Sequence, residues 1–409
     1  MISAGSRSRS FSPALVPALF VFGVGALAAC GSSSQSPSDG FAGGDVTADA
    51  ADLAPSDGAD DVGADVANEE DPPVDAAADV KKIPAPQPYP RPSYQDLSET
   101  GLYADFANKV LSDGLVAFEP THKLWSDGAT KRRWIKLPPD TQIDTSDMDH
   151  WIFPVGTKLF KEFSLGGVLL ETRLVERYGA GPEDYWFGAF VWNADQTDAV
   201  FAVDGQQNIN GTMHDAPSQM SCGACHRGDL GRVLGFSAIQ LSRPDNEPTL
   251  KGLATAGLLT NPPPPGVDYP VLGDDVSVAA LGYLHANCGH CHNMNGTSWP
   301  DTQMVLRLTV ADRDLRSSGL YESIVGQTLQ YFRGGGVTMR VSPGDPDNSA
   351  VMVRMQSRTE KIQMPPLATE IVDPDGVAAV RAWITSLPAP ASPDGGVDAA
   401  AGDVADVGQ

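Results

Sequence analysis

Basic residues are scarce in this chain. Its 409 residues include 28 Lys and Arg against 52 Asp and Glu, which gives a net charge of −24 with histidine counted as neutral. A nucleic-acid binder needs a basic surface that neutralises phosphates, so the composition excludes that class. The length allows two or three domains of ordinary size, and cores of that size fold without disulfide staples.

Cysteine is also scarce, and its count is odd. The five cysteines are Cys30, Cys222, Cys225, Cys288 and Cys291. An odd cysteine in an exported protein needs its own explanation. The other four form two pairs with the spacing Cys-x-x-Cys.

The N-terminus has the pattern of an export signal. Residues 1–29 contain Arg7 and Arg9, no acidic residue, and an apolar run that ends in small residues. This pattern predicts a signal peptide, and early prolines in the run disfavour a simple membrane span. The tetrapeptide Leu27-Ala28-Ala29-Cys30 resembles the lipobox of bacterial lipoproteins, which implies acylation of Cys30. We therefore expect a lipid-anchored protein in the cell envelope that faces the periplasm, with the outer membrane as its location.

Two acidic segments frame the body of the chain. Residues 31–80 contain 13 acidic residues and no Lys or Arg. Such a composition cannot bury enough apolar surface to offset chain entropy, so we predict a disordered linker over residues 30–84. Residues 391–409 are similarly acidic and are predicted to be a disordered tail.

The body predicts a multidomain α+β protein. Residues 158–163, 168–178 and 185–192 are rich in β-branched and aromatic residues with approximate alternation, which predicts strands. We expect a β-rich first domain, a sandwich or a barrel-like fold, over residues 85–262. A proline-rich run at 261–266 marks the boundary. A mainly α second domain follows over residues 270–390.

The final helix of that second domain is the clearest element. Asp373 and Pro374 are suitable for the N-cap and the first turn of a helix. Apolar residues at helical spacing follow and predict one buried face. They are Val380, Trp383, Ile384 and Leu387.

Both cysteine pairs match the attachment pattern for haem c. Cys222-Gly-Ala-Cys225-His226 and Cys288-Gly-His-Cys291-His292 each offer two thiols for thioether bonds and an imidazole for the iron. A zinc site of four cysteines is disfavoured because the pairs lie in separate predicted domains. Two short disulfides leave both histidines unexplained, and a thioredoxin-like motif needs a βαβ context. The sequence predicts two covalent haem c groups.

Sixth ligands are predicted for only one of the two haems. Met364 precedes the final helix in a proline-stiffened loop, and His292/Met364 ligation suits electron transfer; a core role for Met364 is the alternative. The sixth ligand of the first haem stays open, with His214 preferred. The other candidates are Met213, Met220, His122 and His150.

The chain resembles known cytochromes in two ways. Ser277 to Leu387 resembles a class I cytochrome c domain, which has a helix leading into CxxCH, a methionine loop and a terminal helix. In that fold the first and last helices cross, commonly through a glycine and an aromatic residue on the first helix. Ala280 and Leu284 stand at those positions here and predict a looser crossing.

More of the chain, about Tyr94 to Leu387, resembles a family of exported bacterial dihaem c-type proteins. Several phrases carry the resemblance. They are Leu137-Pro-Pro-Asp140, Phe153-Pro-Val-Gly-Thr157, Glu171-Thr-Arg-Leu174, Val191-Trp-Asn-Ala-Asp-Gln-Thr-Asp-Ala199, Val233-Leu-Gly-Phe236 with Gln240-Leu241, Tyr283-Leu-His-Ala-Asn-Cys288, and Pro343-Gly-Asp-Pro346 with Ser349. Relatives joined to a quinoprotein dehydrogenase imply electron flow from an exported dehydrogenase or another redox protein.

The resemblance favours an electron carrier over a catalyst. A dihaem peroxidase-like enzyme is the first alternative, and it needs an open coordination position with a general acid or base beside it. A binding module with an appended cytochrome domain is the second. No catalytic residue is assigned.

Overall fold

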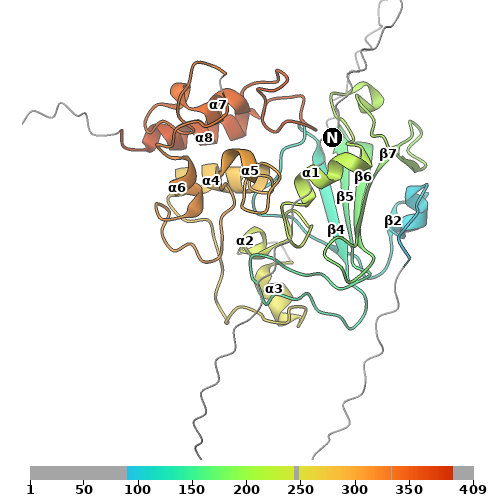
Figure 1. Ribbon diagram of the computed structural model, residues 1–409. Helices are drawn as coiled ribbons and strands as arrows, with labels where there is room; N and C mark the ends of the chain where they lie inside the picture. The colour runs from blue at the N-terminus through green and yellow to red at the C-terminus, as the bar shows by residue number, and fades with distance from the viewer. Residues whose placement is uncertain (1–89, 244–247, 333, 390–409) are drawn as a thin grey trace, which may run out of the picture. The chain divides into compact units, whose positions relative to one another are not determined.

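The computed structural model describes residues 90–243, 248–332 and 334–389, and antiparallel strands dominate the first range. Six strands form one sheet in which neighbours along the chain are neighbours in space (Figure 1). The predicted strands at 158–163, 168–178 and 185–192 are confirmed as its three long central strands. The six are β3 (Val116–Ala117), β4 (Thr130–Lys136), β5 (Lys158–Leu165), β6 (Val168–Arg177), β7 (Tyr185–Trp192) and β8 (Ala199–Phe201).

The sheet is open, with β3 and β8 at its edges. A second sheet has only the two short strands β1 (Tyr103–Asp105) and β2 (Val110–Leu111). The β-rich region is therefore confirmed, but its described strands form neither a closed barrel nor a sandwich of two full sheets. Alternation of apolar residues indicates that one face of a strand is buried; it does not indicate what covers that face.

Register assigns the strand residues to two faces. Trp134, Phe160 and Leu174 lie opposite one another on β4, β5 and β6, and they pack with the segment that contains β1 and the short helix η1 (Leu97–Thr100). Arg133, Lys161 and Arg173 form the adjacent row on the same strands. Because side chains alternate between faces, this row lies on the opposite face, which we call the inner face.

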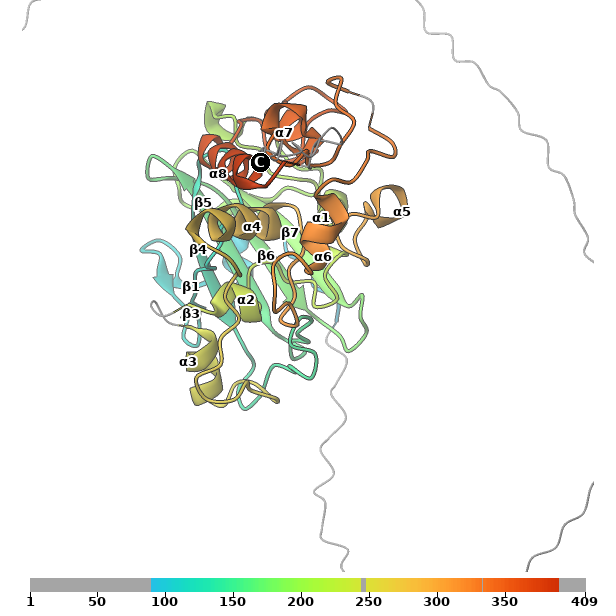
Figure 2. The same ribbon diagram turned by 90° about the vertical axis from the view of Figure 1, so that its left-hand side faces the viewer.

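Helices dominate the chain after the sheet. Two of them, α4 and α8, pack against each other and build a core with α6 and α7 (Figure 2). The helices are α1 (Gln219–His226), α2 (Ala238–Leu241), α3 (Leu250–Thr255), α4 (Asp275–Asn287), α5 (Trp299–Thr302), α6 (Gly319–Ile324), α7 (Ala350–Met355) and α8 (Pro374–Ser386), with 3₁₀ turns η2 (Ile209–Gly211) and η3 (Pro346–Asn348).

Helix α8 confirms the predicted start and the predicted buried face. The Asp373 side chain accepts hydrogen bonds from the backbone N–H groups of Asp375 and Gly376, each at 3.1 Å. Val380, Trp383, Ile384 and Leu387 are all buried.

Gly376 explains how α8 approaches α4 so closely. A Cβ atom at Gly376 would lie 2.2 Å from the Tyr283 ring of α4. The glycine is therefore on the last helix and the aromatic residue on the first. The prediction of a looser crossing, drawn from Ala280 and Leu284, is wrong because it considered the first helix alone.

The described residues form a mixed α+β structure within one compact unit, Lys82–Gln409. That unit includes both predicted domains, 85–262 and 270–390. Within the described part, no helix has the length and apolar character needed to cross a bilayer. Cys30, the predicted signal peptide, the predicted linker and the predicted tail lie outside the described residues.

Candidate functional site

The first CxxCH segment occupies α1, which lies against β7. The helix begins at the Ser218 N-cap, whose hydroxyl accepts a hydrogen bond from the Ser221 N–H at 3.2 Å. Positions three and four apart share one face of a helix. Cys222, Cys225 and His226 therefore project from the same side of α1, toward the inner face of the sheet.

One nitrogen of His226 is held by the backbone. Its Nδ1 lies 2.7 Å from the carbonyl oxygen of Arg232. A carbonyl only accepts, so Nδ1–H donates, and the neutral ring keeps a lone pair on Nε2. Burial lowers the pKa of His226 to about 4, which favours this neutral form. The result is the orientation that metal-ligating histidines adopt.

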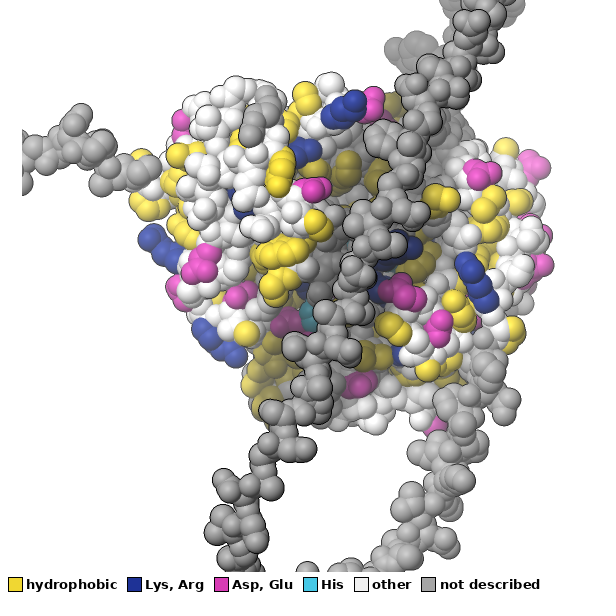
Figure 3. All heavy atoms as spheres, in the orientation of Figure 1, with side chains coloured by type: hydrophobic (Ala, Val, Ile, Leu, Met, Phe, Trp, Pro, Cys, Tyr) yellow, Lys and Arg dark blue, Asp and Glu magenta, His cyan; other side chains and the backbone are white. Residues whose placement is uncertain are grey.

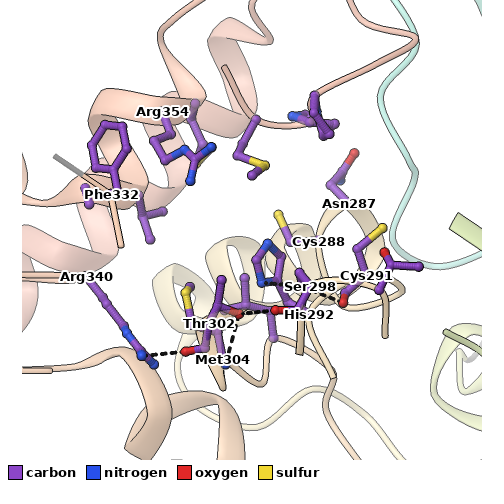
Figure 4. A pocket seen from close by; sticks show the side chains of 18 of the residues that line it. Asn287, Cys288, Cys291, His292, Ser298, Thr302, Met304, Phe332, Arg340 and Arg354 are labelled. Carbon is purple, nitrogen blue, oxygen red and sulfur yellow. Dashed lines mark hydrogen bonds between the residues drawn. The ribbon is translucent and has the colours of Figure 1, made fainter. Parts of the chain in front are cut away.

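The second CxxCH segment begins where α4 ends, with Cys288 as the C-cap. His292 Nδ1 lies 3.0 Å from Ser298 Oγ, which itself donates to the Cys291 carbonyl at 2.6 Å (Figure 4). The hydroxyl therefore accepts from Nδ1–H, and Nε2 again keeps its lone pair. Burial lowers the pKa of His292 to about 4.

A cavity of about 640 Å³ lies beside the second segment. Cys288, Cys291 and His292 line it, and so does Met364 of the loop before α8. Figure 4 shows Cys288 and His292 on one side of the pocket with Arg354 and Phe332 across it. Its volume is in the range of roughly 300 to 1,000 Å³ typical of cofactor pockets. The residues present thus fit a haem-sized group with a thioether and an imidazole in its walls.

A smaller cavity of about 130 Å³ lies beside the first segment. Cys222, Cys225 and His226 line it together with the inner-face residues Arg133, Lys161 and Arg173. This volume is below the usual range for cofactor pockets. The donor set fits a c-type haem, whereas the enclosed space would have to widen to admit one.

The two cavities adjoin. Five residues line both of them: Cys225, Asn287, His290, Pro365 and Leu367. The Cys291 thiol donates to the Ala224 carbonyl at 3.3 Å, and the Thr297 hydroxyl donates to the same oxygen at 3.1 Å. The two CxxCH segments are therefore in direct contact, although they lie far apart in the sequence.

The contact brings together one group that the sequence did not predict. The ligand atoms of Cys225, His290 and Cys291 all lie within 4.8 Å of one another. Cys291 also hydrogen bonds to Cys225, and this bond lowers the pKa of the Cys225 thiol. Placement of the two pairs in separate predicted domains is thus no argument against a shared metal site. However, Cys222 and Cys288 are outside this group, so it offers three ligands where structural zinc takes four.

The candidates for the sixth ligand of the first haem lie elsewhere. His214 is buried, with Nε2 2.8 Å from Glu171 Oε1 and no hydrogen-bond partner for Nδ1 in the described part. Met213 and Met220 are exposed. His122 packs beside Gly282 of α4, and the buried Nδ1 of His150 also has no partner among the described residues. None of these five lines the smaller cavity.

Comparison with known proteins does not assign a family. No family model, no curated protein and no solved structure matches the chain. The geometry of the two CxxCH segments and the cavities beside them is therefore the basis for the function proposed below.

Proposed function

We propose that the chain is a dihaem c-type cytochrome that transfers electrons in the cell envelope. The observation that carries the proposal is the 640 Å³ cavity, because Cys288, Cys291, His292 and Met364 all line it. Cys288 and Cys291 would form the thioether bonds, His292 Nε2 would ligate the iron, and Met364 Sδ would complete the coordination. Cys222, Cys225 and His226 would hold a second haem in the same manner. A haem c group, when bound, supplies reversible one-electron oxidation and reduction.

The arrangement of helices supports a class I cytochrome c domain in the second region. Helix α4 leads into Cys288, the Met364 loop follows α7, and α8 returns to pack against α4. The Gly376–Tyr283 approach supplies the close helix crossing typical of the domain. Met364 and His292 line one cavity, as two ligands of the same iron would.

Contact between the two segments favours electron transfer over catalysis. The two cavities share a wall of Cys225, Asn287, His290, Pro365 and Leu367, so the two attachment segments would hold their groups in neighbouring cavities. A peroxidase-like site would need a general acid or base beside an open position. No carboxylate lines the smaller cavity in the described part, and His290, the histidine besides His226 that lines it, lies against Cys225 and Cys291.

The proposal extends to partners and location. We infer an exported dehydrogenase or another redox protein as electron donor, and a lipid anchor at Cys30 that keeps the protein at the periplasm-facing side of the envelope, at the outer membrane. Acidic and basic side chains are interspersed on the face seen in Figure 3. Such a surface suits a transient electron-transfer encounter, which needs only a small interface.

Haem content of the denatured full chain tests the proposal. The chain is produced in a host that attaches haem c, then unfolded, and its haem and zinc are measured. We expect about two haems that survive denaturation, because thioether bonds are covalent. The double variant C222S/C225S and the double variant C288S/C291S should each retain one, and they serve as controls for each other.

Two results would contradict the proposal. Zinc without haem would assign Cys225, His290 and Cys291 to a metal site instead. Haem that is released by denaturant would exclude thioether attachment. In the ferric protein, two low-spin haems support a carrier and one high-spin haem supports the enzyme.

A further inference from the structure

The inner face of the sheet concentrates positive charge beside the first CxxCH segment. Arg133 of β4 lies directly opposite Lys161 of β5, which lies directly opposite Arg173 of β6. Lys131 lies two residues before Arg133 on the same face. Like charges in directly opposed positions destabilise a sheet. The row is therefore costly unless something negative lies beside it.

Among the three members of this row, protein acids in the described part pair only with Arg173, whose guanidinium donates to both carboxylate oxygens of Glu171. Glu171 is fully buried, and its carboxylate is shared by Arg173 and His214. The Glu119 carboxylate raises the pKa of Arg133 through its negative charge but forms no ion pair with it. The ion pair of Glu119 is with Lys123, at 2.5 Å. Arg133 and Lys161 thus have no ion pair in the described part.

Arg133 is the most informative member of the row. It is only 5% exposed, yet its guanidinium has no hydrogen bond to any described residue. Burial lowers its pKa to about 10. Buried charges in proteins are normally paired, and guanidinium groups bind carboxylates in a bidentate manner.

The row opens into the smaller cavity rather than into the protein core. Arg133, Lys161 and Arg173 line it together with Cys222, Cys225 and His226. Leu159 and Val175 of the same inner face line it too, so the wall combines an apolar patch with a cationic row. A planar apolar group that carries carboxylates matches both parts of this wall.

We propose that Arg133 and Lys161, beside the Glu171-paired Arg173, form an oxyanion site, and that the propionate carboxylates of the haem attached at Cys222 and Cys225 fill it. The inference rests on the proposed function, because the carboxylates are those of the attached haem. A free oxyanion such as phosphate has the same chemistry and is the other source that the experiment distinguishes. The positive charges of these side chains would raise the reduction potential of this haem.

Redox titration of the purified full-length holoprotein tests the site. R133Q should shift the reduction equilibrium of the first haem toward the ferric form by about three- to tenfold, tenfold being ~59 mV for one electron. The reason is that a nearby cation favours the ferrous state, which carries one positive charge less. K161Q should shift it in the same direction, and it is a second route if R133Q folds poorly. The first haem is recognised as the one that a Met364 variant leaves unchanged.

K136Q is the matched control. Lys136 is on the same strand as Arg133, and its odd spacing from Arg133 puts it on the opposite face. It should leave both haem potentials unchanged. If K136Q shifts the first haem as much as R133Q does, the effect is one of general charge and the site is overturned.

Inorganic phosphate separates the two sources of oxyanion. Calorimetric titration of phosphate into the wild-type holoprotein should show no saturable binding, because the propionates already fill the site. Phosphate binding that R133Q abolishes, with the haem potential unchanged, would overturn the assignment to the propionates. Insensitivity of both measurements to R133Q and K161Q would overturn the oxyanion site itself.

Failure of the proposed function gives a different signal. The mass of the peptide that contains Cys222 and Cys225 reports whether haem is attached there. A peptide without haem contradicts the first haem and the inference together. A haem-bearing peptide with an insensitive potential contradicts the inference alone.

Discussion

The two CxxCH segments share a five-residue pattern but border cavities that differ in volume and in the charge of their walls. The second borders a cavity of about 640 Å³ that also exposes Met364. The first borders a cavity of about 130 Å³ whose wall carries Arg133, Lys161 and Arg173. Under the proposed function, the difference would give one chain two ways to set a haem potential: through the ligand in the second region and through charge in the first.

The anchors of the two histidines differ as well. The His226 ring donates to the backbone carbonyl of Arg232, whereas the His292 ring donates to the side-chain hydroxyl of Ser298. A backbone acceptor cannot be removed by substitution of a side chain, but a hydroxyl can. The second region is therefore the one whose ligand chemistry mutations can dissect.

Replacement of Met364 should have the largest effect on this comparison. M364A leaves the haem attached through Cys288 and Cys291 but removes the soft ligand that favours ferrous iron. We expect one haem to become high-spin or water-ligated. The equilibrium constant for reduction of this haem should fall at least about a hundredfold, which lowers its reduction potential by ~120 mV. Ferric absorption spectra and a redox titration measure both changes.

Met304 provides the control for this experiment, because it lines the same cavity. M304A should leave the spin state of both haems unchanged. If M304A removes the low-spin signal and M364A does not, the ligand assignment is reversed. A lower free energy of unfolding in M364A, with both haems still low-spin in the folded protein, would assign Met364 to the core.

Disruption of the crossing between α4 and α8, which belongs to the second region, should have the next largest effect. G376A would place a Cβ 2.2 Å from the Tyr283 ring. Overpacking of this kind costs about 1–3 kcal/mol in the free energy of unfolding. Chemical denaturation measures that loss.

Gly319 is a matched control at the start of α6, where a Cβ would make an ordinary contact of 3.5 Å with Val305. G319A should be neutral or stabilising, because alanine favours a helix over glycine. Equal stability of G376A and the wild type would show that the Tyr283 ring moves aside and that the close approach is not required.

Local pattern was sufficient for several elements. The strands at 158–163, 168–178 and 185–192 are marked by composition over six or more residues. The start of α8 is marked by Asp373 and Pro374, where capping depends on adjacent residues. Each CxxCH segment needs only helical or turn geometry to bring its thiols and imidazole to one side. These features depend on neighbours in the sequence.

The remaining features depend on contacts between distant segments. The row of Arg133, Lys161 and Arg173 exists only because register aligns three strands, and composition does not specify register. The approach of Cys225 to Cys291 depends on how α1 and α4 are brought together. Because the sequence predicts the two pairs in separate domains, it does not predict that contact. The close crossing at Gly376 was missed because the glycine lies on the unexpected partner helix.

Removal of the Ser298 hydroxyl should have the smallest effect and would sharpen the contrast between the two anchors. S298A leaves the Nδ1–H of His292 without its acceptor, which makes the imidazole a weaker donor to iron. A weaker donor stabilises ferric iron less, so the reduction potential of the second haem should rise by ~30 mV, which is about threefold in the equilibrium constant.

S323A is the control, because Ser323 donates to the Val305 carbonyl at 2.9 Å and has no hydrogen bond to His292 among the described residues. A redox titration in which S298A and S323A behave alike would show that the hydroxyl does not tune His292. A shift of the first haem instead would show that His226 and His292 are coupled through the shared wall more strongly than each is coupled to its own anchor.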